Sequence, residues 1–182
     1  MKEVKLSDYS LKAVKTFMGH EGYGLNANLY RGKKKVATIL DDANGGEMDI
    51  YWEDRKADKV DLEETHYSGE KNTYPGTPEE KLFIELLAKE PARDQDAKFK
   101  EFLGDKYYVT ADIYIGEMAS EYEKIKHIRN ACRGHVCYRL KSSKEGEYIS
   151  IKTCFSPHVK IFLEGKYGDD LLEIYNETIA KK

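Results

Sequence analysis

The alternation of apolar and polar residues predicts that the chain begins with an antiparallel β-meander. In the first of its strands, Ala13 and Lys15 fall on one face and Lys12 on the other. Turns at Gly32 and at Asn44-Gly45 can take the positive φ values that tight turns require. Four segments alternate in the way of half-buried strands: residues 11–17, 23–30, 35–40 and 48–52.

The pattern after the meander changes from strand to helix. Residues 54–74 have little periodicity and many charges, so we predict a long loop there. Thr77 and Glu80 are spaced as a capping box, and Pro78 stands at the first helical position. A helix is therefore expected to begin here and to end before Pro91, with its apolar stripe on Leu82, Phe83, Leu86 and Leu87.

The rest of the chain predicts more helices and a second β-hairpin. Apolar spacing indicates a short helix from residue 94 or 95 to 103, a short strand or extended entry over 107–110, and a helix over 112–132. A hairpin over 135–140 and 148–153 follows, then a helix that begins at Ser156-Pro157 and is broken by Gly165 and Gly168, and an amphipathic tail over 171–179.

These elements predict one α+β domain over residues 1–182, with an N-terminal β-meander, central helices, and a C-terminal β-hairpin followed by two short helices. The chain is 40% hydrophobic, which is enough apolar material for a real core at this length. Two lobes within the domain, 1–56 and 75–182, remain an alternative.

Composition narrows the setting of the protein. The sequence has no apolar run long enough to span a bilayer and no secretory signal at its start, so we expect a soluble, intracellular protein with no membrane partner. The odd number of cysteines, three, favours reduced thiols over a disulfide framework. No cofactor signature is present, and the glycines of Gly22-Tyr23-Gly24 precede a strand rather than the helix that a nucleotide-binding loop needs.

Charge is distributed unevenly along the chain. Residues 1–40 contain eight Lys or Arg and three Asp or Glu, which gives a net charge of +5. Residues 41–70 contain three Lys or Arg and eleven Asp or Glu, which gives a net charge of −8. An acidic stretch of this kind is ordinarily a solvated face, and the alternative is a docking surface for a basic partner.

Cysteine and histidine residues gather in the second half of the sequence. Zinc would need four of these side chains in tetrahedral geometry, and their spacing matches no usual zinc finger. Small cysteines on strands are ordinary core residues, so packing is favoured over metal binding. The residues concerned are Cys132, His135, Cys137, Cys154 and His158.

Acidic residues at the third turn of the meander form a second candidate site. Carboxylates at one sheet edge can hold Mg²⁺ for phosphodiester cleavage. Short acidic side chains before Asn44-Gly45 are also typical of a turn, where they bond their own backbone, and the turn is the favoured interpretation. The candidate catalytic carboxylates are Asp41, Asp42, Glu47 and Asp49, with Glu21 facing them.

A basic hairpin tip is the best-supported contact surface. Lysines neutralise phosphates and tyrosines stack on bases, so such a hairpin could contact nucleic acid or another partner. A solvated turn rich in lysine is the alternative. The contact surface is predicted to comprise Tyr23, Asn26, Asn28, Tyr30, Arg31, Lys33, Lys34 and Lys35.

Residues 17–30, followed by Asp41-Asp42-Ala43-Asn44-Gly45-Gly46, resemble the opening of small accessory proteins of phages and prophages. Arg139-Leu140, Ser156-Pro157 and Lys166-Tyr167-Gly168 share this resemblance. Among such proteins the chain is similar to inhibitors of type II CRISPR effector nucleases. The similarity covers about a third of the residues, and its motifs consist of structural glycines and turn residues.

This resemblance implies a binding inhibitor, rather than an enzyme, acting in the cytoplasm of a bacterial host. Its partner would be a type II CRISPR effector nuclease with its guide RNA, or target DNA. The acidic stretch would compete for the effector's basic channels while the basic hairpin contacts nucleic acid. The alternatives are a Mg²⁺-dependent ribonuclease that shortens guide RNA, and an interaction module unrelated to CRISPR.

Overall fold

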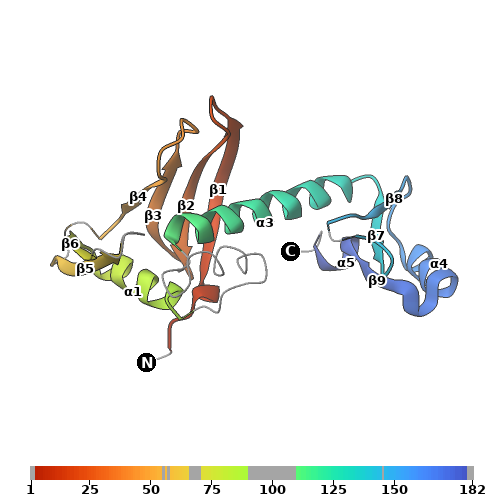
Figure 1. The fold of residues 1–182 in the computed structure, drawn as a ribbon. Helices are drawn as coiled ribbons and strands as arrows, with labels where there is room; N and C mark the ends of the chain where they lie inside the picture. Colours follow the sequence, from red (N-terminus) through yellow and green to blue (C-terminus); the bar gives the residue numbers. More distant parts are fainter. Residues whose placement is uncertain are drawn as a thin grey trace. The chain divides into compact units, whose positions relative to one another are not determined.

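The computed structural model of the protein describes residues 3–54, 56, 58–65, 71–89, 110–144 and 146–179. They form the predicted α+β fold, with helices and strands in the order shown in Figure 1. The chain divides into two compact units, Met1–Ala119 and Ser120–Lys182, which are described separately below. The boundary lies within a helix rather than between the two expected lobes, and the single-domain organisation stays a prediction.

The predicted β-meander forms the first sheet of unit 1. A 3₁₀ turn, η1 (Leu6–Asp8), leads into four antiparallel strands that lie in chain order. Gly32 and Gly45 have φ values of 61° and 79°, which confirms both turn predictions. The strands are β1 (Tyr9–Met18), β2 (Tyr23–Arg31), β3 (Lys34–Asp41) and β4 (Asp49–Trp52).

A β-bulge changes the predicted faces of β1. The register with β2 shifts between Lys12 and Lys15, and Ala13 has a φ of 53°. The extra residue reverses the alternation, so Lys12 pairs with Asn28 and Lys15 with Asn26 on the same face of the sheet. The expectation that Lys12 and Lys15 point to opposite faces is therefore wrong.

The segment predicted as a long loop contains a second, two-stranded sheet. Strands β5 (Val60–Thr65) and β6 (Lys71–Gly76) pair antiparallel, and among their described side chains it is Leu62 of β5, at 4% exposure, that joins the core. Because the remaining described side chains of β5 are polar or only half buried, local alternation carries little signal. Pairing with a second strand decides the structure.

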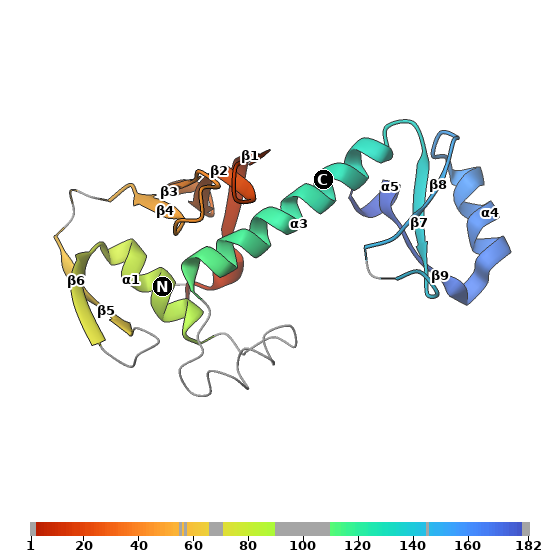
Figure 2. The same ribbon diagram turned by 45° about the horizontal axis from the view of Figure 1, so that its top comes forward.

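The helix after this hairpin begins as predicted. In α1 (Pro78–Leu87) the Thr77 hydroxyl accepts a hydrogen bond from the Glu80 amide, and the Glu80 carboxylate accepts one from the Thr77 amide, both at 3.2 Å. Figures 1 and 2 show α1 beside the β5-β6 hairpin. Phe83, fully buried, is the centre of the packing of α1 against the first sheet.

The core of unit 1 lies between α1 and one face of the meander. The Phe83 ring is 4.8 Å from Tyr9 and 5.8 Å from Trp52, between ring centroids. Leu25, Ala27 and Leu29 of β2 are buried on this face. The first part of α3 (Ala111–Ala131) contributes the Tyr114 ring, 5.9 Å from Phe83. The short helix expected from residue 94 or 95 to 103 lies outside the described residues, as does the strand or extended entry expected over 107–110, apart from Thr110.

Unit 2 contains a three-stranded antiparallel sheet in the order β8-β7-β9. The hairpin of β7 (Val136–Leu140) and β8 (Ile149–Ile151) is confirmed. α4 (Pro157–Tyr167) continues through Gly165 and ends at Gly168, so only the second predicted break occurs, and a 3₁₀ turn, η4 (Gly168–Asp170), follows.

The C-terminal tail differs from its prediction. Its first residues form β9 (Leu171–Ile174), paired with β7, and only α5 (Tyr175–Thr178) is helical. Figure 2 shows α4 on one face of this sheet and α5 on the other. The core on the α4 face comprises Val136, Tyr138, Leu163 and Ile174.

Asn176 joins α5 to the loop between α3 and β7. Its Oδ1 accepts a hydrogen bond from the Cys137 amide at 2.8 Å, and its Nδ2 donates to the carbonyls of His135 at 2.9 Å and Cys132 at 3.3 Å. Asn176 is 6% exposed, so these backbone groups have little access to water if the side chain is removed.

We expect Asn176→Ala to lower the free energy of unfolding by about 2–3 kcal/mol, because buried amide and carbonyl groups lose their partner. Urea denaturation followed by circular dichroism measures the change. The control Asn130→Ala removes an exposed amide from α3 and should change stability by less than about 0.5 kcal/mol. Equal stability of the two variants would contradict a structural role for Asn176.

Candidate functional site

The cysteine and histidine cluster does not form a metal centre in the part of the chain that the structure describes. No three His, Cys, Asp or Glu side chains among these residues are placed to share a metal ion. Cys137 is fully buried, and burial, together with a hydrogen bond to Cys137, raises the pKa of the Cys132 thiol to about 12. The raised pKa keeps the Cys132 thiol protonated, and Cys137 packs in the core.

The acidic residues near the third turn mostly bond the turn itself. Asp41 accepts a hydrogen bond from the Ala43 amide at 2.9 Å, and Asp42 accepts from the amide and side chain of Asn44, each at 3.0 Å. Asp49 accepts from the Tyr51 hydroxyl at 3.3 Å, and Glu47 is exposed. Glu21 does approach this turn, since its amide donates to the Ala43 carbonyl. The geometry supports the turn interpretation.

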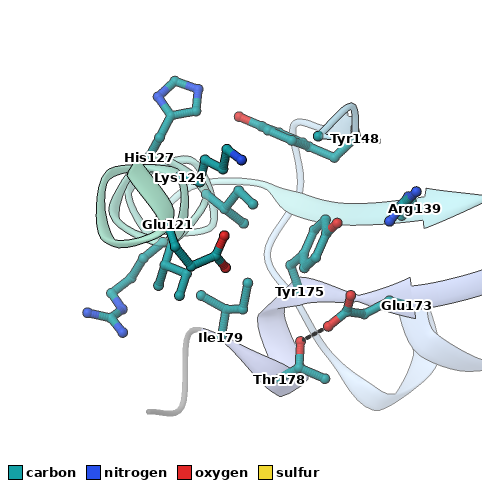
Figure 3. A pocket seen from close by; sticks show the side chains of 13 residues that line it. Glu121, Lys124, His127, Arg139, Tyr148, Glu173, Tyr175, Thr178 and Ile179 are labelled. Carbon is teal, nitrogen blue, oxygen red and sulfur yellow. Dashed lines mark hydrogen bonds between the residues drawn. The ribbon is translucent and has the colours of Figure 1, made fainter. Parts of the chain in front are cut away.

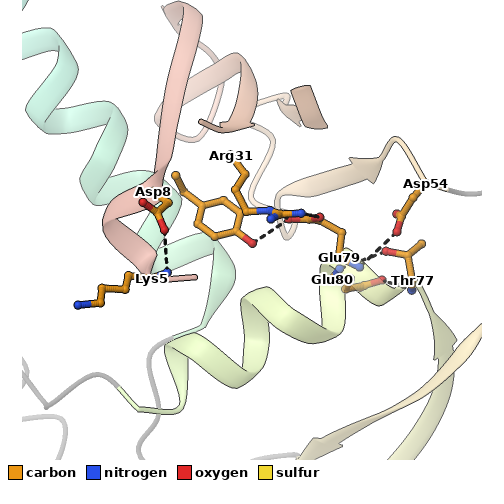
Figure 4. Close-up of polar contacts among 8 residues, drawn as sticks. Lys5, Asp8, Arg31, Asp54, Thr77, Glu79 and Glu80 are labelled. Atoms are coloured by element: carbon orange, nitrogen blue, oxygen red, sulfur yellow. Dashed lines mark hydrogen bonds and ion pairs between the residues drawn. The ribbon is translucent and has the colours of Figure 1, made fainter. Parts of the chain in front are cut away.

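Arg31 belongs to a buried network and not to the basic tip (Figure 4). Its Nε and Nη2 donate to the two carboxylate oxygens of Glu79, each at 2.7 Å, and the Tyr9 hydroxyl donates to the same carboxylate at 2.8 Å. The Glu79 side chain is 7% exposed and that of Arg31 is 31% exposed. The predicted role of Arg31 as a contact residue is therefore not supported by its position.

The contacts of this network shift the pKa values of Arg31 and Tyr9. The hydrogen bond to Glu79 raises the pKa of Arg31, and burial followed by the hydrogen bond to Glu79 raises the pKa of Tyr9. Asp54 accepts from the Glu79 amide at 3.2 Å, at the start of α1. Arg31 follows Leu25, Ala27 and Leu29 at a spacing of two, so the alternation of β2 already places it on the core face.

The remaining residues of the predicted contact surface are divided among different environments. Lys35 forms an ion pair with Glu53 at 2.8 Å, whereas Lys33 and Lys34 are exposed near the turn and have no ion pair within the described residues. Tyr23 is 75% exposed at the end of β2, on the same side as Leu25. The structure therefore separates Tyr23 from Tyr30, which points to the opposite face.

The face of the meander opposite the core forms a second, larger surface, which we call the open sheet face. No helix or strand of the described residues covers it, and it contains cations, amides and aromatic rings. It comprises Lys12, Lys15 and Phe17 of β1, Asn26, Asn28 and Tyr30 of β2, Lys35, Thr38 and Leu40 of β3, and Asp49 and Tyr51 of β4.

The strand register arranges these side chains in rows across the sheet. One row contains Lys15, Asn26, Leu40 and Asp49, and the next contains Lys12, Asn28, Thr38 and Tyr51. Each row runs from a lysine on β1, through an amide on β2, to the acidic or phenolic side chain of β4. The face thus has two lysines along β1 and one carboxylate, Asp49, on β4.

Lysine and aromatic side chains lie together on the basic side. The Lys12 ammonium is 4.3 Å above the centre of the Tyr30 ring. Lys12 and Lys15 are exposed, and neither has an ion pair within the described residues. Phe17, Leu40 and Tyr51 are each about two-fifths exposed. These three side chains add exposed apolar area to an otherwise polar face.

Lys12 and Lys15 are the functional candidates that sequence reasoning missed. A regular strand separates them onto two faces, and only the bulge at Ala13 brings them together. Ala13 offers no sequence signal for a bulge, because glycine, not alanine, is the residue that tolerates a positive φ.

Comparison with known protein families, with curated proteins and with solved structures finds no match to this chain. Among the described helices, none has the length and apolar character needed to cross a membrane. The arguments for function therefore rest on the residues and geometry of the chain itself.

Proposed function

We propose that the protein binds single-stranded nucleic acid on the open sheet face and, in the setting indicated by its sequence resemblance, thereby inhibits a type II CRISPR effector nuclease. The observation that carries the first part is the uncovered face on which Lys12 lies over Tyr30, beside Lys15 and two amides. Proteins that bind single strands combine such cations with exposed rings.

Each group on the face has a distinct role in this proposal. Lys12 and Lys15 neutralise phosphates, because neither ammonium has a carboxylate partner within the described residues. Tyr30 and Phe17 stack on unpaired bases, which a duplex does not expose. The side-chain amides of Asn26 and Asn28 can donate hydrogen bonds to base edges and accept hydrogen bonds from them. Neither amide is hydrogen-bonded to another side chain of its row.

The acidic side of the face supplies the second contact with an effector complex. Such effectors hold their guide RNA and target strand in positively charged channels. Unit 1 contains both the basic strand β1 and several acidic side chains. These are Asp49 on β4, the exposed Asp58 just before β5 and the exposed Asp61 within β5. One surface can then engage nucleic acid while its acidic neighbour competes for basic protein groups.

A cleavage assay with a type II effector, its guide RNA and a target DNA tests this proposal. We expect added protein to reduce target cleavage while the guide RNA keeps its length on the same gel. Shortening of the guide, abolished by Asp42→Ala, would instead establish the ribonuclease alternative. Target cleavage unchanged by excess protein across several effectors would overturn the CRISPR part and leave an unrelated binding module.

A further inference from the structure

Unit 2 contains a cavity of about 530 Å³ on the face of its sheet away from α4 (Figure 3). Its walls come from the second half of α3, from β7, from the turn before β8 and from α5. Ile125 and Ile179 contribute apolar surface, while the polar groups include Glu121, Lys124 and Arg139. All lining residues lie within Ser120–Lys182, so the cavity belongs to one compact unit.

Arg139 is a cation without an acidic partner at this cavity. Its Nε is buried and has no hydrogen-bond partner among the described residues. Glu173 stands opposite in the β7-β9 register, yet its carboxylate accepts from the Thr178 hydroxyl at 2.5 Å and forms no ion pair with Arg139. A buried donor of this kind calls for an acceptor, because such groups are rarely left unsatisfied.

Tyr175 is a neutral neighbour of Arg139. Burial, followed by the charge of Glu173, raises the pKa of Tyr175, and the charge of Arg139 partly opposes this rise. The Lys124 ammonium on α3 is a second cation at the cavity, and it too has no ion pair within the described residues. Figure 3 shows Lys124 on the side of α3 that faces Tyr148. Glu121 and Glu173 line the same cavity but form no ion pair with either cation, so both cations can bind an external anion.

Aromatic rings form the walls next to these cations. Tyr148 and Tyr175 meet edge to face with centroids 6.2 Å apart, and His127 lies 6.2 Å from Tyr148. A planar ring can stack on an aromatic wall of this kind. Glu121 projects from α3 toward Tyr175 in Figure 3 and can accept a hydrogen bond from a ring amine.

We propose that this cavity binds a small molecule that joins a planar ring to an anionic group, of the class of nucleoside monophosphates. The phosphate accepts from Arg139 and Lys124, the base stacks on Tyr148, and Glu121 accepts from an exocyclic amine. The cavity volume lies within the usual range of about 300–1,000 Å³ for small-molecule sites. This site is separate from the open sheet face and does not depend on the function proposed for it.

Isothermal titration of the full chain with adenosine monophosphate, uridine monophosphate, adenosine and inorganic phosphate tests the proposal. We expect adenosine monophosphate to bind most tightly, with adenosine and phosphate each weaker by about tenfold or more, because each lacks one of the two recognised groups. The Glu121 contact further predicts that adenosine monophosphate binds more tightly than uridine monophosphate, whose base has no exocyclic amine.

Variants assign the binding to this cavity. Arg139→Gln and Tyr148→Leu should each weaken adenosine monophosphate binding by about tenfold. Arg133→Gln, which removes an exposed arginine outside the cavity, should leave the affinity unchanged. Circular dichroism checks the fold of each variant, and Lys124→Gln on the surface of α3 replaces any variant that fails to fold.

Three results would overturn the proposal. The first is the absence of saturable nucleotide binding at concentrations up to about 5 mM, where even weak sites are occupied. The second is binding that persists unchanged in Arg139→Gln and Tyr148→Leu, or in Lys124→Gln where it replaces one of them. The third is an affinity for inorganic phosphate alone equal to that for the nucleotide.

Discussion

Replacement of Glu79 by alanine is expected to lower the free energy of unfolding by about 3–5 kcal/mol, because it leaves the Arg31 guanidinium without its partner beside a buried core. The carboxylate accepts three hydrogen bonds, two from Arg31 and one from the Tyr9 hydroxyl. It is 7% exposed, so water cannot fully replace these bonds. Chemical denaturation of the full chain, followed by circular dichroism, measures the loss.

Glu85→Ala is the matched control, since Glu85 is an exposed glutamate of the same helix. It should change stability by less than about 0.5 kcal/mol. Replacement of the three side chains that share the Glu79 carboxylate by apolar residues of similar volume, in Tyr9→Phe/Arg31→Met/Glu79→Leu, should recover much of the loss, because neither charge of the Arg31–Glu79 pair is then left without its partner. A Glu79→Ala protein as stable as Glu85→Ala would contradict the buried network.

The second large effect is expected on nucleic-acid binding. Tyr30→Ala should weaken binding of a single-stranded RNA by about tenfold or more, because stacking on one ring contributes about 1–3 kcal/mol per base. Tyr23→Ala is its matched control: Tyr23 belongs to the same strand but points to the opposite side, at 75% exposure. Fluorescence anisotropy with a labelled oligonucleotide compares the two variants.

The two lysines of β1 should act through the phosphates. Affinity falls as salt rises, so a plot of log affinity against log salt has a negative slope. In Lys12→Gln/Lys15→Gln this slope should become less steep by about 1.4, because each phosphate that a lysine neutralises on a single strand contributes about 0.7 to its magnitude. Lys81→Gln/Lys89→Gln removes the same charge from exposed positions in and just after α1 and should alter the slope much less. Equal effects of the two pairs would mean that net charge, not the open sheet face, governs binding.

These measurements also separate two interpretations of the basic hairpin. Both interpretations include Tyr30, so the lysines separate them: if the tip carries the binding, Lys33→Gln/Lys34→Gln weakens it, whereas the open sheet face requires Lys12, which lies over Tyr30. Arg31 is a poor test of either interpretation, because its substitution breaks the network with Glu79 and changes stability. Weaker binding by an Arg31 variant would report unfolding as readily as a direct role of Arg31 in binding.

Local physical chemistry explains how much of the fold can be predicted from the sequence. The meander strands alternate because one face is buried, and Gly32 and Gly45 adopt positive φ in the turns. Thr77 and Glu80 cap α1 through contacts three residues apart. Each of these signals depends on near neighbours in the chain, so it is visible before any tertiary contact is known.

The errors arise where a distant segment decides the outcome. Residues 171–174 become a strand because β7 offers a free edge, although their apolar spacing also suits a helix. The polar β5 gains its structure from β6. In both places the local preference is weak, and hydrogen bonds to another strand outweigh it.

Periodicity and short-range hydrogen bonds were enough to specify the α+β class, the meander with its turns, and the capped start of α1. Long-range packing was needed to bring Arg31 to Glu79, 48 residues away, and the bulge at Ala13 was needed to place Lys12 and Lys15 on one face. Packing also brought Arg139 to a cavity wall shared with α3 and α5. Functional surfaces depend on such distant neighbours, which no local pattern encodes.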